Sequence, residues 1–468
     1  MDLVCPLDFR YGRADMKALW TEEARLRYLL AVEAALAHAH AETGTIPKSA
    51  AARLQKVADS GRVKPDRVKE IEAEIKHDLM AVVKAMAEVA DQMEEESRAG
   101  KAPRAGARPT EPAGRFIHLG ATSYDIIDTA NSLQFRDAMA LLRTGLRRLR
   151  DALLGQADAH RHTTMLGRTH GQAAVPITFG LKMAVYASEV GRHLDRLAEV
   201  EARVAVGMMS GATGSMAAFR GKGIAVQAAV CKRLGLRPVT ASTQIIQRDR
   251  YIELFSLLAN IATSLEKFST EVRTLQRTEI GEVAEGFDAK KQVGSSTMPH
   301  KQNPITSEQV SGLARLVRSM VLPVWENAVQ WNERDLANSA PERFLHPHAF
   351  ILLDHIVHQM AKVFAELRVF PERMQENMDR AQGLMMAESV MIALTEKGIG
   401  RQDAHEMARE ASMHAIAKRV HYSKALAAHE GISKALGKKG IADAVDPRKY
   451  VGPVDAIIDQ VTAETKGL

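Results

Sequence analysis

The sequence predicts an all-α fold built around a long helix bundle, and two observations predict it. The first is composition: aromatic residues make up only 5% of the 468 residues, whereas methionine occurs 21 times and hydrophobic residues reach 46%. Alanine, leucine, methionine and long charged side chains favour helices, while strands favour aromatic and β-branched residues. The second is spacing: apolar residues over 254–275 recur at steps of four and three, which is typical of long packed helices.

The N-terminal part is expected to be helical. Thr21, followed by two glutamates, has the chemistry of a helix N-cap, and Gly44 marks the end of that helix. A second helical stretch is expected over 65–98. The segment 99–114 is rich in glycine, proline, alanine and arginine and lacks periodicity, which predicts a surface loop.

Three central helices carry apolar seams that need partners. The seam positions are Val190, Leu194, Leu197, Val200 and Val204; Leu254, Leu258, Ile261, Leu265, Phe268, Val272 and Leu275; and Val310, Leu313, Val317, Met320 and Val324. Pro323 should kink the third helix, because proline lacks the N–H that a helix interior uses. Helices of about 30 residues predict a long bundle, one that is shared between subunits.

Changes in composition divide the chain into three lobes. Residues 1–114 are expected to form an N-terminal helical domain, 115–370 the central long-helix bundle, and 371–468 a C-terminal helical domain. Glycines separate the shorter helical segments of the third lobe.

Charge and composition exclude several classes of function. The net charge is +6 from 63 basic and 57 acidic residues, and the chain lacks the basic blocks of nucleic-acid-binding tails. It also lacks a run of about 18 apolar residues, so no membrane span is predicted. Two cysteines make no disulfide framework and no metal-ligand spacing stands out, which favours a cytoplasmic protein without a metal. A small anionic ligand suits the modest positive charge.

Four polar segments interrupt the helical pattern. They are HLGATSYDIIDTA at 118–130, GRTHGQ at 167–172, GSSTMPHKQNP at 294–304 and WNERDLANSAPERF at 331–344. Each segment alone is typical of a polar loop or a helix cap. Together they offer hydroxyls, histidines, a lysine and arginines, which can bind anions and move protons, so we expect them to build an active site.

The third segment resembles the signature loop of the fumarase/aspartase superfamily of helical lyases, whose core is GSSxMPxKxN. The resemblance extends, in the superfamily's order, to LDFRYGRADM near the start, KHD at 76–78, TQIIQRDR at 243–250 and LQRTEIGEV at 275–283. The Arg-Tyr pair near the start, the His-Asp pair and the ERD…ER segment are similar to the adenylosuccinate lyase branch. This similarity implies a three-lobed helical lyase of fumarase/aspartase-like fold.

The resemblance also implies a reaction, namely β-elimination of fumarate from an N-succinyl nucleotide in purine biosynthesis. Adenylosuccinate would give AMP, and SAICAR would give AICAR, without cofactor or metal. Ser295 would be the base and His170 the acid, while Lys301 would stabilise the serine alkoxide, Glu308 would orient His170, and His77 would be a further catalytic residue. The enzyme would be a homotetramer whose active sites are shared between subunits.

Substrate contacts are implied in the same way. Those assigned to the nucleotide and its phosphate are Arg10, Tyr11, Arg334, Ser339 and Arg343. Those assigned to the succinyl group and the rest of the substrate are Lys76, Asp78, His118, Thr122, Ser123, Gln244 and Asn303. Arginine suits phosphate because its planar fork donates two parallel hydrogen bonds.

Three alternatives remain open at the level of sequence. Val175, Pro176 and Ile177 after GRTHGQ are closer to a 3-carboxymuconate cycloisomerase, although such an enzyme need not keep the phosphate arginines. An argininosuccinate lyase of the same superfamily is the second alternative. A non-catalytic helical scaffold on this fold is the third, and the intact signature loop argues against it.

Overall fold

The computed structural model describes residues 4–99, 111–287, 297–298 and 300–468. The chain forms two compact units, each made of three stretches of sequence. Unit 1 comprises Met1–Thr144, Asp195–Thr263 and Ala314–His355, and unit 2 comprises Gly145–Leu194, Ser264–Leu313 and Ile356–Leu468. The division into lobes 1–114, 115–370 and 371–468 remains a prediction, and most of the predicted 99–114 loop lies outside the described residues.

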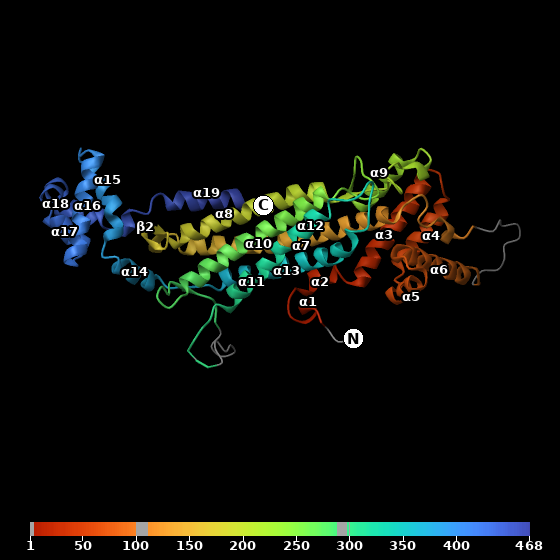
Figure 1. Cartoon of the computed structure of the whole chain (residues 1–468), viewed down its shortest axis with the longest axis horizontal. Coiled ribbons are helices and arrows are strands. Elements are labelled where there is room, and N and C mark those ends of the chain that lie inside the picture. The colour runs from red at the N-terminus through yellow and green to blue at the C-terminus, as the bar shows by residue number, and fades with distance from the viewer. Residues whose placement is uncertain (1–3, 100–110, 288–296, 299) are drawn as a thin grey trace. The chain divides into compact units, whose positions relative to one another are not determined.

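The described residues are predominantly helical, so the predicted all-α class is confirmed (Figure 1). The helices of unit 1 are α1 (Pro6–Phe9), α2 (Ala14–Ala18), α3 (Glu22–Glu42), α4 (Lys48–Asp59), α5 (Pro65–Ile75), α6 (Asp78–Ala99), α9 (Gly223–Leu234) and α12 (Val321–Glu326). Those of unit 2 are α14 (Pro371–Arg380), α15 (Ala387–Glu396), α16 (Arg401–Lys418), α17 (Tyr422–Ala428), α18 (Glu430–Ala444) and α19 (Val454–Thr465). Five helices contribute residues to both units: α7 (Ser123–Ala159), α8 (Phe179–Val204), α10 (Asp249–Leu275), α11 (Ile305–Ser319) and α13 (Ser339–Ala365). Short 3₁₀ turns are η1 (Ala113–Phe116), η2 (Ala217–Phe219), η3 (Leu384–Met386) and η4 (Pro447–Lys449).

The predicted seams lie on these long helices. Every seam position on α8 and α10 is at most 4% exposed. The third seam follows α11 and α12, but the helix breaks at Met320, which stays partly exposed. Pro323 explains the break, because it has no N–H for the carbonyl of Ser319 and its ring crowds that carbonyl. The predicted kink is therefore a break between two helices.

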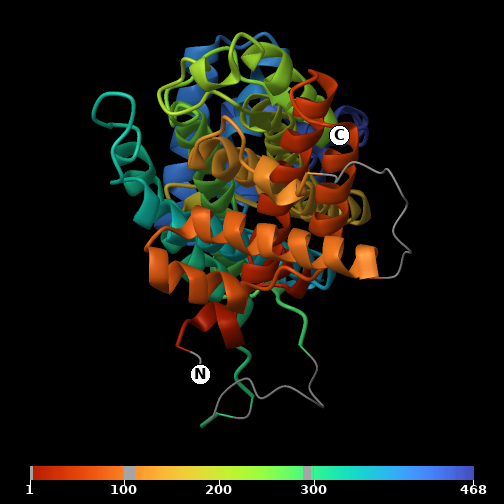
Figure 2. The same ribbon diagram turned by 90° about the vertical axis from the view of Figure 1, so that its right-hand side faces the viewer.

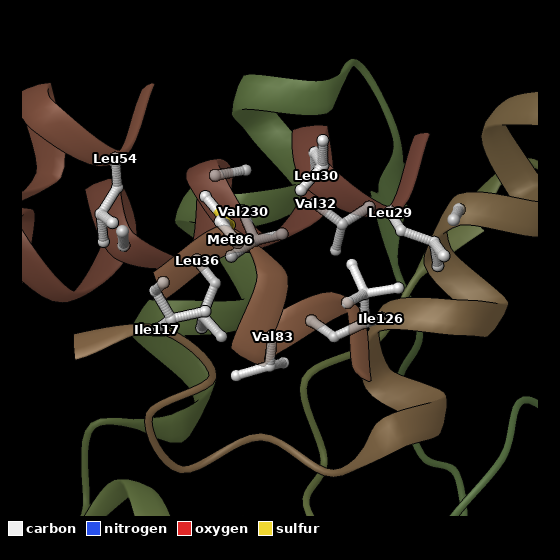
Figure 3. Close-up of a cluster of buried hydrophobic side chains, with 14 of the residues drawn as sticks. Leu29, Leu30, Val32, Leu36, Leu54, Val83, Met86, Ile117, Ile126 and Val230 are labelled. Carbon is white, nitrogen blue, oxygen red and sulfur yellow. The ribbon is translucent and has the colours of Figure 1, made fainter. Parts of the chain in front are cut away.

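The N-terminal helices of unit 1 pack around one apolar cluster (Figure 3). Buried members include Leu36 of α3, Leu54 of α4, Met86 of α6 and Val230 of α9. The predicted N-cap is confirmed, because the hydroxyl oxygen of Thr21 accepts a hydrogen bond from the backbone N–H of Ala24 at 3.1 Å.

The helical stretch predicted over 65–98 is in fact two helices, α5 and α6, which lie side by side (Figure 2). Lys76 ends α5 in a left-handed conformation (φ 56°), and its N–H donates to the carbonyl of Glu72 at 2.8 Å. Asp78 begins α6, and its carboxylate accepts from the N–H of Leu79 at 2.7 Å. Periodicity missed this break because neither glycine nor proline marks it.

Among the described residues, strands occur only as two-stranded pairs. The pairs are β1 (Thr164–Thr169) antiparallel to β2 (Gln172–Thr178), β3 (Val206–Gly207) parallel to β4 (Arg237–Pro238), and β5 (Val283–Ala284) antiparallel to β6 (Arg368–Val369). The first pair matters most for function, because this hairpin carries the GRTHGQ segment.

A buried ion network fixes the start of α13 within unit 1. Arg248 donates to both carboxylate oxygens of Asp128 at 2.7 and 3.0 Å, and to both oxygens of Glu342 at 2.7 and 3.1 Å. The three side chains are at most 8% exposed. Buried charges are tolerated when they are paired and hydrogen-bonded in this way. The network therefore holds in place the helical turn that carries Ser339 and Arg343.

Helices α15 to α18 pack around a second apolar cluster in unit 2, which includes Val390, Tyr422 and Ile432. None of the helices that the structure describes combines the length and the apolar character needed to cross a bilayer.

Candidate active site

The predicted site residues are divided between the two units. Unit 1 holds the residues from the segments near 10, 77, 120, 244 and 340, and unit 2 holds His170, Lys301, Asn303 and Glu308. Ser295 lies outside the described residues. Each unit thus carries part of the predicted chemistry.

The loop that precedes α7 is fixed by a buried aspartate. Asp125 accepts from the backbone N–H of Thr122 at 2.8 Å, which is the return bond of a helix capping box. Its other oxygen accepts from the N–H of Ser210 at 2.6 Å. Burial raises the pKa of Asp125, and these backbone donors oppose the rise. Thr122 and Ser123 therefore lie half-buried at a rigid helix N-terminus.

His118 is held by a buried carboxylate. Its φ of 62° is unusual for a residue with a bulky side chain. Glu33 of α3 accepts from the backbone N–H of His118 at 3.1 Å and lies 2.7 Å from its Nδ1. Burial opposes the charged imidazole, but the hydrogen bond and charge of Glu33, with a contribution from Asp125, outweigh burial and raise the pKa of His118. The imidazole therefore keeps its positive charge to higher pH than a free histidine does.

The KHD junction contacts the first turns of α13. Asp78 accepts from Nη2 of Arg343 at 2.8 Å. His77 is exposed, and its Nδ1 accepts from the N–H of Met80 at 3.3 Å. Lys76 is also exposed. Two predicted substrate contacts, Asp78 and Arg343, are thereby brought together from distant parts of the sequence.

Arg334 has an open hydrogen-bonding edge. Its Nη1 donates to Oε1 of Gln244 at 3.0 Å, and its guanidinium carbon lies 3.5 Å from the ring centroid of Tyr124. Its Nε and Nη2 are buried and have no hydrogen-bond partner among the described residues. These two N–H groups form the edge by which arginine binds an anion through two parallel bonds. Because unpaired buried donors are costly, this edge indicates a ligand site.

A cavity of about 400 Å³ in unit 1 is lined by Tyr124, Ser339, Arg343 and Asp78, among others. Arg25 of α3 also lines it. Burial lowers the pKa of Arg25, and the positive charge of Arg343 lowers it further. Glu22, Glu72 and Glu342 line the cavity as well, and Arg343 is itself paired with Asp78, so the charge of the lining is mixed.

Arg10 and Tyr11 do not line this cavity. The guanidinium carbon of Arg10 is 5.8 Å from the ring centroid of Tyr11, and the ring of Tyr11 meets that of His355 edge-on at 5.7 Å. Unit 1 therefore does not gather all the predicted nucleotide residues in one pocket.

His170 stands at the tip of the β1–β2 hairpin. His170 and Gly171 form the two-residue turn with φ values of 54° and 73°, as in a type I′ turn. Arg168 anchors the hairpin by donating to both oxygens of the buried Glu282 at 3.0 and 2.6 Å. The exposed His170 is thus carried on a braced strand pair, as a positioned proton donor requires.

The described part of the signature loop borders a cavity of about 720 Å³ in unit 2. Lys301, Asn303 and Glu308 line it, whereas His170 does not. His170 and Glu308 share no hydrogen bond or ion pair in the described part of the chain. The orientation of His170 by Glu308 remains a prediction.

Three supporting residues carry little signal in the sequence. Arg25 lies among charged residues at the start of α3, where a buried charge looks like a solvated one, whereas Glu33 lies in the alanine- and leucine-rich middle of that helix. Tyr124 lies inside the TSYD motif and could have been found from its place between Ser123 and Asp125.

Comparison with known proteins identifies the family. A family model described as Lyase matches residues 9–319, and one described as Adenylosuccinate lyase C-terminus matches residues 383–461. The adenylosuccinate lyase of Methanocaldococcus jannaschii is 44% identical over 463 residues, which cover 99% of this chain and 96% of that protein. That of Pyrococcus abyssi is 44% identical over 458 residues, which cover 98% of this chain and 97% of that protein.

The fold itself is shared more widely. The 3-carboxy-cis,cis-muconate lactonizing enzyme from Pseudomonas putida matches with a TM-score of 0.85 at 31% identity, covering 98% of this chain and 99% of that chain. Fold similarity therefore does not separate the branches, whereas sequence identity and the C-terminal family model do. The chain belongs to the adenylosuccinate lyase family of the fumarase/aspartase-like helical lyases.

Proposed function

We propose that the protein is a lyase that removes fumarate from adenylosuccinate to give AMP, and from SAICAR to give AICAR. The observation that carries this proposal is the 44% identity to an adenylosuccinate lyase over nearly the whole chain. The open edge of Arg334 supports it, because a substrate phosphate would pair those buried donors. Carboxymuconate and argininosuccinate carry no phosphate, so this feature disfavours both alternative substrates. A non-catalytic scaffold would leave the donors unpaired.

The reaction needs a base, an acid and a group that stabilises the negative charge of the carbanion. In our assignment Ser295 takes the proton from the carbon next to a succinyl carboxylate, and the electron pair spreads into that carboxylate. The C–N bond then breaks, the double bond of fumarate forms, and His170 protonates the leaving nitrogen. Lys301 stabilises the serine alkoxide and Glu308 orients His170. His77 is assigned as a further catalytic residue.

The remaining assignments concern substrate binding. Arg334, Ser339 and Arg343 bind the phosphate end, with Arg10 and Tyr11 completing the nucleotide contacts. The other proposed contacts are Lys76, Asp78, His118, Thr122, Ser123, Gln244 and Asn303. The contact between Nδ1 of His118 and Glu33 at 2.7 Å supports the place of His118 here, because it fixes the orientation of the imidazole.

We also propose a homotetramer in which each active site takes residues from three copies. An apolar surface over residues 316–344 of unit 1 supports this assembly. Its large side chains, each at least 50% exposed, are Leu316, Leu322, Trp325, Val329, Trp331, Leu336 and Phe344. Exposed large apolar side chains, when they gather along one segment in this way, favour a protein interface. A cytoplasmic location stays a prediction from the cysteine count.

The test is direct incubation of the purified protein with adenylosuccinate, followed by ultraviolet absorbance and chromatography for AMP and fumarate. We expect conversion without added metal or cofactor, and conversion of SAICAR as well. A folded preparation that is inactive on both substrates but active on carboxymuconate would overturn the proposal.

A further inference from the structure

Tyr124 lies beside two of the residues proposed to hold the substrate phosphate. Its ring centroid lies 3.5 Å from the guanidinium carbon of Arg334, which is close for a cation stacked on an aromatic face. Ser339 lines the same cavity as Tyr124. Tyr124 is only 6% exposed, so the stacked pair lies in a largely water-excluded place.

The other contacts of Arg334 explain how the ring of Tyr124 would aid the binding of an anion. Nη1 of Arg334 donates a hydrogen bond to Oε1 of Gln244 at 3.0 Å. Nε and Nη2 of Arg334 are buried and have no hydrogen-bond partner in the described part of the chain. A flexible arginine would have to lose side-chain entropy when it bound an anion. Stacking on Tyr124 on one side and bonding to Gln244 on another fixes the plane of the guanidinium before the ligand arrives.

Ser339 and Tyr124 also share the lining of the 400 Å³ cavity in unit 1, together with Arg343. Arg334 stacks on the ring of Tyr124 but is not among the residues that line this cavity. Tyr124 therefore contacts Arg334 and also borders the cavity that Ser339 and Arg343 line.

We propose that Tyr124 is a positioning residue that holds the guanidinium of Arg334 preformed for the phosphate of the nucleotide. This role rests on the proposed function, because it presupposes a nucleotide substrate. It makes Tyr124 a determinant of affinity rather than of the chemical step, since the phosphate of such a substrate is remote from the C–N bond that breaks.

Two substitutions of graded severity test the role. Tyr124→Phe keeps the ring face on which Arg334 stacks, so AMP affinity and KM should stay within about three-fold of those of the unchanged protein. Tyr124→Leu removes the stacking, so AMP affinity and KM should worsen by about 10- to 100-fold. In both variants kcat should stay within about two-fold, because only uniform binding is lost. Tyr28→Phe is the matched control, since its hydroxyl donates to Asp137 at 2.7 Å and it does not line the cavity.

A double-mutant cycle with Arg334→Gln separates positioning from mere packing. AMP binding, measured by titration calorimetry on the intact protein, should weaken much less on Tyr124→Leu when Arg334 is already replaced. Equal losses in both backgrounds, or a Tyr124→Phe variant that loses as much AMP affinity as Tyr124→Leu, would overturn the role. If the unchanged protein itself failed to bind AMP, the proposed function would fail instead, so the two failures are distinguishable.

Discussion

A buried histidine whose pKa is raised above its ordinary value needs an anion beside it, and Glu33 supplies that anion to His118. The Glu33 side chain is 1% exposed and that of His118 is 12% exposed, so solvent screens their interaction weakly. The pKa of His118 is raised above its ordinary value of 6.5. A raised folded-state pKa stabilises the fold below the ordinary value, and the stabilisation is lost as pH rises through the raised pKa.

Glu33→Gln should therefore lower the pKa of His118, which NMR titration of the imidazole would measure. Because a hydrogen bond to a charged group is lost, the free energy of unfolding should fall by about 1.5–3 kcal/mol in acid solution. The loss should shrink as pH rises through the pKa that His118 has in the unchanged protein. Glu42→Gln is the control, since Glu42 lies on the same helix but pairs with the exposed Arg233. An unaltered pKa of His118 in Glu33→Gln would contradict this assignment.

At the scale of elements, periodicity predicted helices α8 and α10 because their seams are buried along their whole length, whereas the third seam is interrupted at Met320. The same rule could not predict the β1–β2 hairpin, because burial does not alternate strictly along either strand and the turn uses His170 instead of a second glycine. It also missed the break at Lys76, which depends on one left-handed residue. Motif resemblance named most candidate site residues, but not Tyr124 or Glu33, because their roles depend on partners distant in sequence.

A substitution in the hairpin turn can test whether the backbone conformation of the turn positions His170 for catalysis. Gly171 has a φ of 73°, and a Cβ added there would meet nothing within 4 Å, so Gly171→Val adds backbone strain without a clash. That strain costs about 1–2 kcal/mol and should distort the turn. We expect a modest loss of stability and at least about a ten-fold loss of kcat, because a displaced acid protonates poorly.

Gly61→Val is the matched control for that substitution. Gly61 has a φ of 64° and equally open surroundings, and it lies between α4 and α5, where no site residue is predicted. Thermal unfolding should show a similar loss of stability, while steady-state assays should show unchanged kcat. Gly171→Asn should recover most of the activity, because asparagine tolerates positive φ. A Gly171→Val enzyme with full kcat would show that the turn does not position His170.

At the scale of the whole molecule, a single chain does not show all the contacts that the proposed active site needs. His170 is exposed and shares no described contact with Glu308, although the two are proposed to act on the same proton. The apolar surface that includes Trp325, Trp331 and Phe344 is exposed in the single chain. A second copy that covers this surface can also supply the missing neighbour of His170, so assembly and catalysis are two aspects of one proposal.

Complementation between two inactive variants tests that proposal. His170→Ala and Ser295→Ala proteins should each be nearly inactive, because each removes one of the two proton carriers. After co-refolding, a site works when its histidine comes from a Ser295→Ala chain and its serine from a His170→Ala chain. Random mixing makes each condition true half the time, so about a quarter of the sites should recover. Ser295→Ala mixed with Lys301→Ala is the control, because both residues belong to one loop of one chain and no hybrid site regains an intact loop. If subunit exchange is verified by mass and the first mixture stays as inactive as its parents, the two residues act within a single chain and the shared-site tetramer is wrong.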